Sequence, residues 1–241
     1  MAKTFEAMQK IKQISAENRG VNCHFSQWNF TSLRKKSSLA DILSKMGIES
    51  NSDKSLTFHF ASVQDGEGTT TILVNLARFL TDNESLKNVL FIDGNLENPI
   101  FHMAFNLPLS PGFGEVLTKK AEISQAAYRI ESSSVFIMPG GNAACSSSIS
   151  LESEAIAEFV KAIKYKFPVV IFDSPPLLSS PISLLWAHAA DVSFMVIQAN
   201  RTLWEVAKKA QTLLENNNCK IGGVILNRVQ YSIPRWLYKR L

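Results

Sequence analysis

The sequence predicts an α/β protein with a three-layer, P-loop NTPase-like fold, in which helices cover both faces of a mainly parallel sheet. From residue 55 onward, short and almost wholly apolar runs alternate with helical patterns. Such runs are typical of parallel strands that are buried on both faces. A glycine-containing loop joins the first strand-like run to the first helix-like run. With 241 residues and 46% hydrophobic content, the chain can bury one sizeable core.

Periodicity places the individual elements. The expected strands are Leu56–Val63, Asn88–Ile92, Val135–Met138, Val169–Phe172, Val192–Gln198 and Ile221–Leu226. Helical patterns lie between them and include Thr70–Leu80, Leu151–Tyr165 and Thr202–Asn216. In a sheet of this kind, ligands bind at the carboxyl ends of the strands.

The chain divides into three parts by composition. Residues 1–54 form a helical and partly disordered extension, with apolar residues at helical spacing in Phe5–Ile14 and again in Leu39–Met46. Residues 55–232 form the P-loop domain. Residues 233–241 form a basic and aromatic tail.

The composition limits which partners and which cellular compartment we expect for the protein. The net charge of +4 is too small to indicate nucleic acid, so no nucleic-acid partner is expected. The three cysteines are widely spaced and lack metal-ligand spacing, which favours reduced thiols in the cytoplasm. No apolar run approaches the ~18–20 residues that span a bilayer. The polar start MAKTFEAMQK does not read as a secretory signal.

The loop after the first strand carries the strongest chemical signal. A P-loop surrounds phosphates with backbone N–H groups, its lysine reaches the β- and γ-phosphates, and the next hydroxyl binds Mg²⁺. Thr69 stands where that lysine would be, whereas Thr70 can still act as the magnesium hydroxyl. The candidate nucleotide-binding residues here are Gly66, Glu67, Gly68, Thr69, Thr70 and Thr71.

The same loop also carries negative charge. Asp65 and Glu67 lie in or beside it, and a like charge ~4 Å from a phosphate costs roughly 1–4 kcal/mol. Both the missing lysine and these carboxylates act against ATP. Taken alone, the loop fits an ordinary strand-to-helix turn equally well.

Polar residues follow three further strands. Asp93 and Asp173 come at the ends of two strands, where carboxylates are placed to hold Mg²⁺ together with Thr70. Asn227 and Arg228 follow the last strand and complete the candidate cofactor site. A single Asp at a strand end often only caps the next turn, so the set in this order is the informative feature.

Residues 56–230 resemble the bacterial tyrosine autokinases of exopolysaccharide and capsule synthesis, within the partition-type and septum-placement ATPases. The matching stretches are DGEGTTT, VLFIDGNLENP, PGFGEVL, IMPGGN, VVIFDSPPLL, ADVSFMVIQANRT and GGVILNRV. The resemblance implies that Asp93 contacts Mg²⁺ and activates a tyrosine hydroxyl. It further implies that Asp173 holds magnesium through water and that Asn227 lies by the adenine base.

The departures from that family all point away from catalysis. Thr69 replaces the lysine, and Asn95 replaces the second acid of an Asp-x-Asp motif. The Arg-x-x-Arg pattern used for ring assembly is missing before the first strand, and only Tyr231 and Tyr238 remain of the C-terminal tyrosine cluster. We therefore expect a pseudokinase that binds ATP or ADP with Mg²⁺ weakly or not at all. An oligomer is compatible with the sequence.

Three functional hypotheses remain open. The leading one is a regulator or scaffold of exopolysaccharide synthesis that contacts an inner-membrane polysaccharide co-polymerase or a kinase paralogue. The second is an active autokinase or ATPase in which Lys119, Lys120 or a lysine of a neighbouring subunit replaces the lost cation. The third is a positioning ATPase at the inner membrane, because Ile233–Leu241 mixes Trp and Leu with three cations. A terminal helix packed on its own domain explains that tail equally well. His59, in an apolar strand, is expected to be structural.

Overall fold

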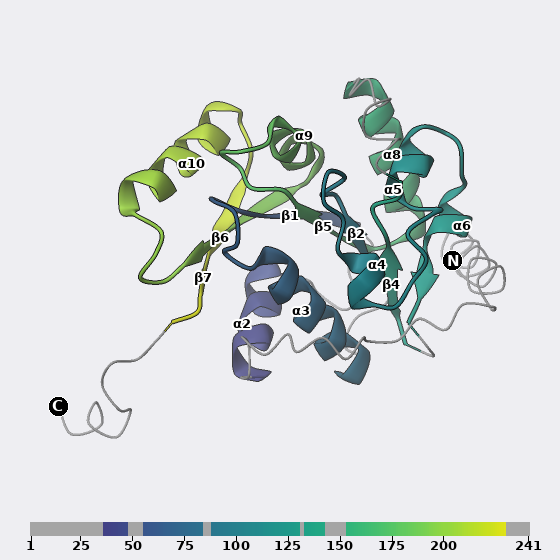
Figure 1. Ribbon diagram of the computed structural model, residues 1–241, viewed down its shortest axis with the longest axis horizontal. Coiled ribbons are helices and arrows are strands. Elements are labelled where there is room, and N and C mark those ends of the chain that lie inside the picture. Colours follow the sequence, from purple (N-terminus) through teal and green to yellow (C-terminus); the bar gives the residue numbers. More distant parts are fainter. Residues whose placement is uncertain (1–35, 48–54, 84–87, 131–132, 143–152, 230–241) are drawn as a thin grey trace.

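The computed structural model describes residues 36–47, 55–83, 88–130, 133–142 and 153–229. The predicted helix at Phe5–Ile14 and the tail Ile233–Leu241 lie outside these residues. A seven-stranded sheet runs through the centre in the order β3-β4-β2-β5-β1-β6-β7 (Figure 1). Every pairing is parallel except that of β3 with β4. The strands are β1 Leu56–Ser62, β2 Val89–Asp93, β3 Tyr128–Arg129, β4 Val135–Met138, β5 Val169–Ser174, β6 Val192–Gln198 and β7 Ile221–Asn227.

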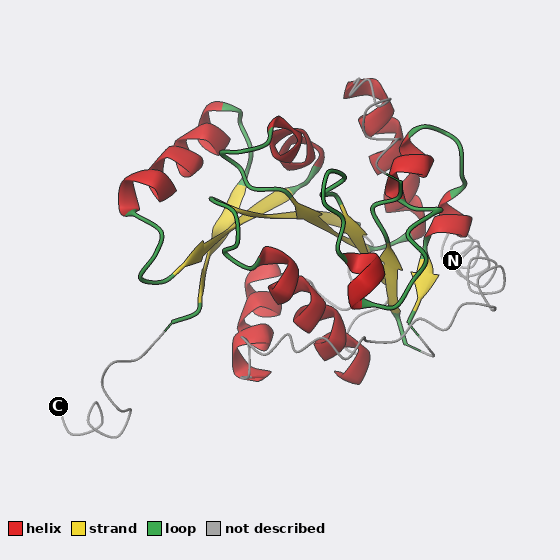
Figure 2. Ribbon diagram, viewed as in Figure 1, coloured by secondary structure: helices red, strands yellow, loops and turns green. Residues whose placement is uncertain are grey.

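Helices lie on both faces of the sheet, as the sequence predicts (Figure 2). Figure 1 places α2 and α3 on one face and α9 and α10 on the other. The helices are α2 Lys36–Met46, α3 Thr69–Asn83, α4 Phe101–Ala104, α5 Phe113–Leu117, α6 Ile123–Ala126, α8 Ser153–Lys166, α9 Pro181–Ala189 and α10 Trp204–Asn216. The three-layer α/β fold is therefore confirmed.

The core is divided by the sheet. One cluster of buried side chains joins α2, α3 and α4 to one face, and it includes Leu39, Leu76 and Phe101. On the opposite face, one cluster surrounds Phe113 and Trp186, and another surrounds Ala210 and Leu214. Because Leu39 belongs to the first cluster, α2 packs on the core of the P-loop domain, although the sequence assigns it to an extension.

All six predicted strands are present; two have the predicted bounds, and the ends of the other four differ by at most two residues. Five elements were not predicted, namely the short helices α4, α5 and α6, strand β3 and helix α9. Strand β3 has only two residues, too few for an alternating pattern. Helix α9 has the sequence PISLLWAHA, whose apolar residues occur on every side, so it lacks the apolar stripe by which an amphipathic helix is recognised.

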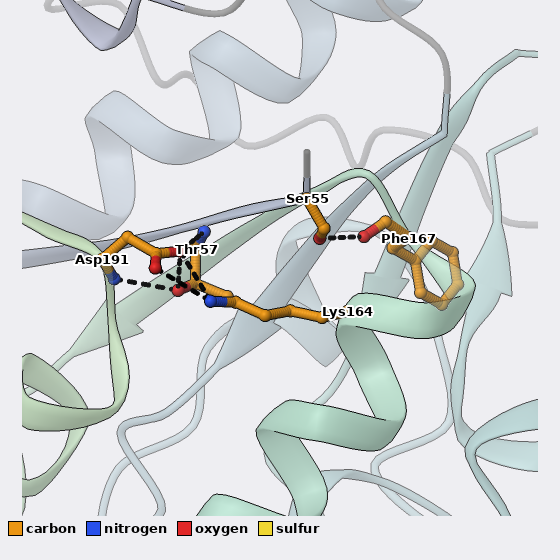
Figure 3. Close-up of polar contacts among 5 residues, drawn as sticks. All are labelled: Ser55, Thr57, Lys164, Phe167 and Asp191. Atoms are coloured by element: carbon orange, nitrogen blue, oxygen red, sulfur yellow. Dashed lines mark hydrogen bonds and ion pairs between the residues drawn. The ribbon is translucent and has the colours of Figure 1, made fainter. Parts of the chain in front are cut away.

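Two polar clusters help hold the strands in place. Asp191 accepts hydrogen bonds from the Thr57 N–H (2.7 Å) and hydroxyl (2.8 Å) and pairs with Lys164 at 2.8 Å (Figure 3). His59 is buried, with its ring nitrogens 3.2 Å and 3.3 Å from the hydroxyls of Ser193 and Ser183. The expectation that His59 is structural agrees with this geometry. Among the described residues, no helix is long and apolar enough to cross a membrane.

Candidate nucleotide site

The loop between β1 and α3 depends on its two glycines. Gly66 and Gly68 have φ angles of 77° and 95°, a region that favours glycine. A Cβ atom at Gly68 would lie 2.5 Å from Nδ2 of Asn227, so a side chain there would displace the loop or the asparagine. The Gly68 carbonyl accepts the first hydrogen bond of α3, from the N–H of Ile72 at 3.0 Å. The loop therefore runs directly into the helix N-terminus, as in a P-loop.

Glu67 anchors this loop from inside. Its side chain is buried, and Oε2 accepts hydrogen bonds from the N–H groups of Val63 (2.8 Å) and Gln64 (2.9 Å). Its Oε1 accepts a hydrogen bond from the Thr202 hydroxyl, which belongs to the β6–α10 connection. The sequence places Glu67 among the candidate nucleotide-binding residues and marks its charge as unfavourable to phosphate, but it does not predict this anchoring role.

Asn227 closes the loop from the end of β7. Its Nδ2 donates to the Glu67 carbonyl oxygen at 2.7 Å, and its Oδ1 accepts from the Arg228 N–H at 2.8 Å. Only 2% of the residue is exposed. Both polar groups of the side chain are thus used within the protein, where they position the loop. The resemblance had placed this residue at the adenine base.

The threonines at the start of α3 lie in different environments. Thr69 is buried, and its Oγ1 has no hydrogen-bond partner in the part of the chain that the structure describes. Thr70 forms a side-chain hydrogen bond with Asp173. Thr71 contributes its carbonyl oxygen to Asn75 Nδ2 at 2.7 Å. Thr70 is therefore the residue that joins the loop to the acidic strand ends.

Asp93 and Asp173 lie opposite each other on the adjacent strands β2 and β5. Both are buried. The N–H groups of Ile100 (2.7 Å) and Phe101 (2.8 Å) donate to Oδ2 of Asp93, whereas its Oδ1 has no partner among the described residues. Burial raises the pKa of the Asp93 carboxyl. Burial and the nearby Asp93 charge also raise the pKa of Asp173, against the lowering effect of the Thr70 hydrogen bond.

These groups fit a magnesium ion. Mg²⁺ prefers oxygen ligands and is usually held by one or two carboxylates with several waters. Thr70, Asp93 and Asp173 offer a hydroxyl and two carboxylates, and the unpartnered Oδ1 of Asp93 is a free acceptor. No group of three or more His, Cys, Asp or Glu residues that could hold a metal occurs among the described residues. A metal here would thus depend on waters or phosphate oxygens for its remaining ligands.

Two arginines follow β6 and β7, and Arg201 approaches the loop. A Cβ atom at Gly66 would lie 3.3 Å from Nη1 of Arg201. Arg201 and Arg228 each donate from Nη1 to the Gln198 side-chain oxygen, at 3.3 Å and 3.0 Å. The sequence identified Arg228 but missed Arg201. The available signal was the polar run QANRT directly after a strand end.

Lys119, one of the expected replacements for the lost lysine, is engaged elsewhere. Its Nζ pairs with Oε2 of Glu158 on α8 at 3.3 Å, and both side chains are exposed. That geometry assigns Lys119 to a surface ion pair and does not support it as the substitute cation.

Comparison with known proteins agrees with this geometry. The family model described as cellulose biosynthesis protein BcsQ matches residues 56–223. The tyrosine-protein kinase YwqD of Bacillus subtilis (strain 168) is 32% identical over 162 residues, which cover 67% of this chain and 68% of YwqD.

Solved structures share the same architecture. The kinase domain of VpsO has a TM-score of 0.67 and 25% identity, with 80% of this chain and 95% of that chain covered. The septum site-determining protein MinD of Pyrococcus horikoshii, complexed with Mg-ADP, has a TM-score of 0.61 and 20% identity. The two chains are covered to 77% and 76%, respectively, and this likeness concerns the fold alone.

Proposed function

The chain belongs to the BcsQ family and is a relative of the bacterial tyrosine kinases, and on this premise we propose that it is a catalytically deficient, tyrosine-kinase-like P-loop protein. It acts as a regulator or scaffold in exopolysaccharide or capsule synthesis. Its partner is an inner-membrane polysaccharide co-polymerase or an active kinase paralogue.

The observation that carries the proposal is Thr69 at the lysine position of an otherwise intact loop. The glycines, the Glu67 anchor and the Asn227 closure are all present. Thr69 is short, uncharged and buried, so it cannot stabilise the negative charge that develops on a transferred phosphoryl group. Loss of one group that stabilises the transition state typically lowers kcat by about 10²–10³-fold.

The second departure from the kinases supports the same conclusion. Asn95 stands where those proteins carry another acid, and its Oδ1 accepts a hydrogen bond from the Asn98 N–H at 3.3 Å. The amide is neutral and caps a turn, so it adds no carboxylate to the pair Asp93 and Asp173. A neutral amide is also a poorer magnesium ligand than a carboxylate.

The pathway assignment follows from the names of the relatives. The matching family model is that of a cellulose biosynthesis protein, and the curated relatives include the tyrosine-protein kinases CpsD of streptococci. A protein that keeps their fold without their chemistry can still occupy the same contact surface. We place it in the cytoplasm, with peripheral contact at the inner membrane through its C-terminal tail.

Deletion and complementation test this role. Deletion of the gene should lower polysaccharide yield, and the wild-type gene should restore it without phosphotyrosine on this chain. The full-length protein should also co-purify with the co-polymerase. Unchanged yield after deletion would refute the pathway role, and phosphotyrosine that disappears in Asp93→Asn would refute the deficiency.

An active autokinase is the second candidate, and the retained acidic pair favours it. Asp93, Asp173 and Thr70 keep the arrangement that a magnesium-dependent transfer needs. It predicts ATP turnover that is lost in both Asp93→Ala and Asp173→Ala. The third candidate, a membrane-bound positioning ATPase, depends on residues outside those described. It predicts that deleting residues 233–241 abolishes binding to liposomes.

A further inference from the structure

Two arginines are held together beside the P-loop. Arg201 lies in the connection between β6 and α10, and Arg228 directly follows β7. Both donate from Nη1 to the same acceptor, the side-chain oxygen of Gln198, at 3.3 Å and 3.0 Å. One neutral amide therefore gathers two positive charges within a few ångströms of each other.

The connection that carries Arg201 is fixed to the loop. The Thr202 hydroxyl donates to the Glu67 carboxylate inside the loop and accepts a hydrogen bond from the Gln198 N–H at 3.0 Å. The Ala199 N–H donates to the Asn227 carbonyl oxygen at 2.9 Å. Because Asn227 also holds Glu67, the β6–α10 connection, the end of β7 and the P-loop form one hydrogen-bonded unit.

Within the described part of the chain, no acidic group forms an ion pair with these two arginines. The nearby Glu67 carboxylate is occupied by two N–H groups and a hydroxyl, and Asp65 lies 3.5 Å from the Ser179 hydroxyl. Two like charges at close range repel each other, and an anion between them would relieve that repulsion.

Two buried oxygen atoms near the loop also lack a partner. Thr69 Oγ1, at the N-terminus of α3, and Asp93 Oδ1, at the end of β2, have no hydrogen bonds among the described residues. The site therefore combines free cations at its rim, the N–H groups of a helix N-terminus, and free oxygens that can meet a hydrated metal. That combination is complementary to phosphate groups bound with Mg²⁺.

We propose that Arg201 and Arg228 supply the positive charge that Thr69 no longer provides, and that they bind the phosphates of a nucleoside di- or triphosphate at this loop. This inference rests on the proposed function and deepens it, because the protein becomes a nucleotide sensor without phosphoryl transfer. Guanidinium groups suit this role, since their planar fork binds phosphate oxygens with two hydrogen bonds.

Nucleotide titration of the full-length chain tests the assignment. Mant-ADP and mant-ATP are titrated with Mg²⁺ into the wild type, Arg201→Gln and Arg228→Gln. We expect saturable binding to the wild type and at least tenfold weaker binding to each variant. Lys119→Gln is the matched control, because it removes a cation that pairs with Glu158, and it should bind like the wild type.

A rescue variant separates charge from folding. Thr69→Lys in the Arg201→Gln background should recover most of the affinity, and circular dichroism should show the same unfolding temperature for all variants that are compared. Wild-type affinity in Arg201→Gln, or no binding to the wild type at millimolar nucleotide, would overturn the inference. If the wild type binds no nucleotide, the proposed scaffold role is unaffected. ATP turnover in the same samples would refute the proposed catalytic deficiency and leave the arginine assignment untouched.

Discussion

The carboxyl groups of Asp93 and Asp173 face the same end of the sheet from directly opposed positions on two parallel strands. Each is at most 2% exposed, and no Lys or Arg among the described residues forms an ion pair with either. Burial raises both pKa values, so the pair favours binding of a proton or a cation. Because two unpaired buried carboxyl groups do not stabilise a core, we propose that the pair is part of a binding site.

In the absence of bound ligand, the substitution Asp173→Asn should increase the stability of the protein. An acid with a raised folded-state pKa binds more protons folded than unfolded, so stability falls as pH rises from about 4 through the folded-state pKa. Removal of this group should raise the unfolding temperature at pH 8, by about 2–4 °C for each kcal/mol gained, and by less at pH 6. Thermal unfolding of both proteins at the two pH values measures this. An unfolding temperature below the wild type at pH 8 would contradict it.

Asp191→Asn is the matched control. It makes the same chemical change as Asp173→Asn, but it should destabilise the protein instead of stabilising it. Burial acts to raise the pKa of Asp191, but hydrogen bonds from Lys164 and Thr57 outweigh it, and the net pKa is lowered (Figure 3). Its stabilising effect is present at neutral pH and lost as pH falls through the lowered pKa. We expect a loss of about 1 kcal/mol in the free energy of unfolding at pH 7. Urea unfolding measures it, and an increase would argue against the pairing.

His59 should make the fold sensitive to mild acid. Burial lowers the pKa of the ring to about 3, against a smaller raising effect from Ser183. A base with a lowered folded-state pKa stays neutral when folded, so protonation of the unfolded chain below pH ~6.5 destabilises the protein. Between pH 7.5 and 5.5 this costs about 1.4 kcal/mol. His59→Gln should lack that part of the pH dependence in urea unfolding, and a parallel pH profile in the two proteins would count against it.

Gly68→Ala should disrupt the loop more than a similar change elsewhere. Its φ of 95° is strained for alanine, and the new Cβ would lie 2.5 Å from Asn227 Nδ2. Gly47→Ala is the control, because Gly47 has a φ of 62° but nothing within 4 Å of a new Cβ. We expect a loss of about 1 kcal/mol for Gly47→Ala and more for Gly68→Ala. Only Gly68→Ala should also weaken mant-nucleotide binding, and equal losses in both measurements would reject this account of the loop.

The sequence predicts the sheet and the carboxylate pair well because both depend on local pattern. A buried apolar strand that ends in Asp can be recognised from a few consecutive residues. In a parallel sheet, the ends of such strands lie at the same edge. The inward turn of Glu67 and the approach of Arg201 to Gly66 could not be predicted in this way. They depend on how the β6–α10 connection packs on a loop more than 130 residues earlier, as the contact between Thr202 and Glu67 shows.

We propose that the loop retains the architecture of a nucleotide site and has lost phosphoryl transfer because Thr69 replaces the lysine. Incubation of the full-length chain with Mg-ATP labelled at the γ-phosphate tests this most directly, with Asp93→Asn and Thr69→Lys in parallel. We expect label on tyrosine and release of phosphate to be no greater in the wild type than in Asp93→Asn. Label transfer by the wild type that is abolished in Asp93→Asn would contradict it.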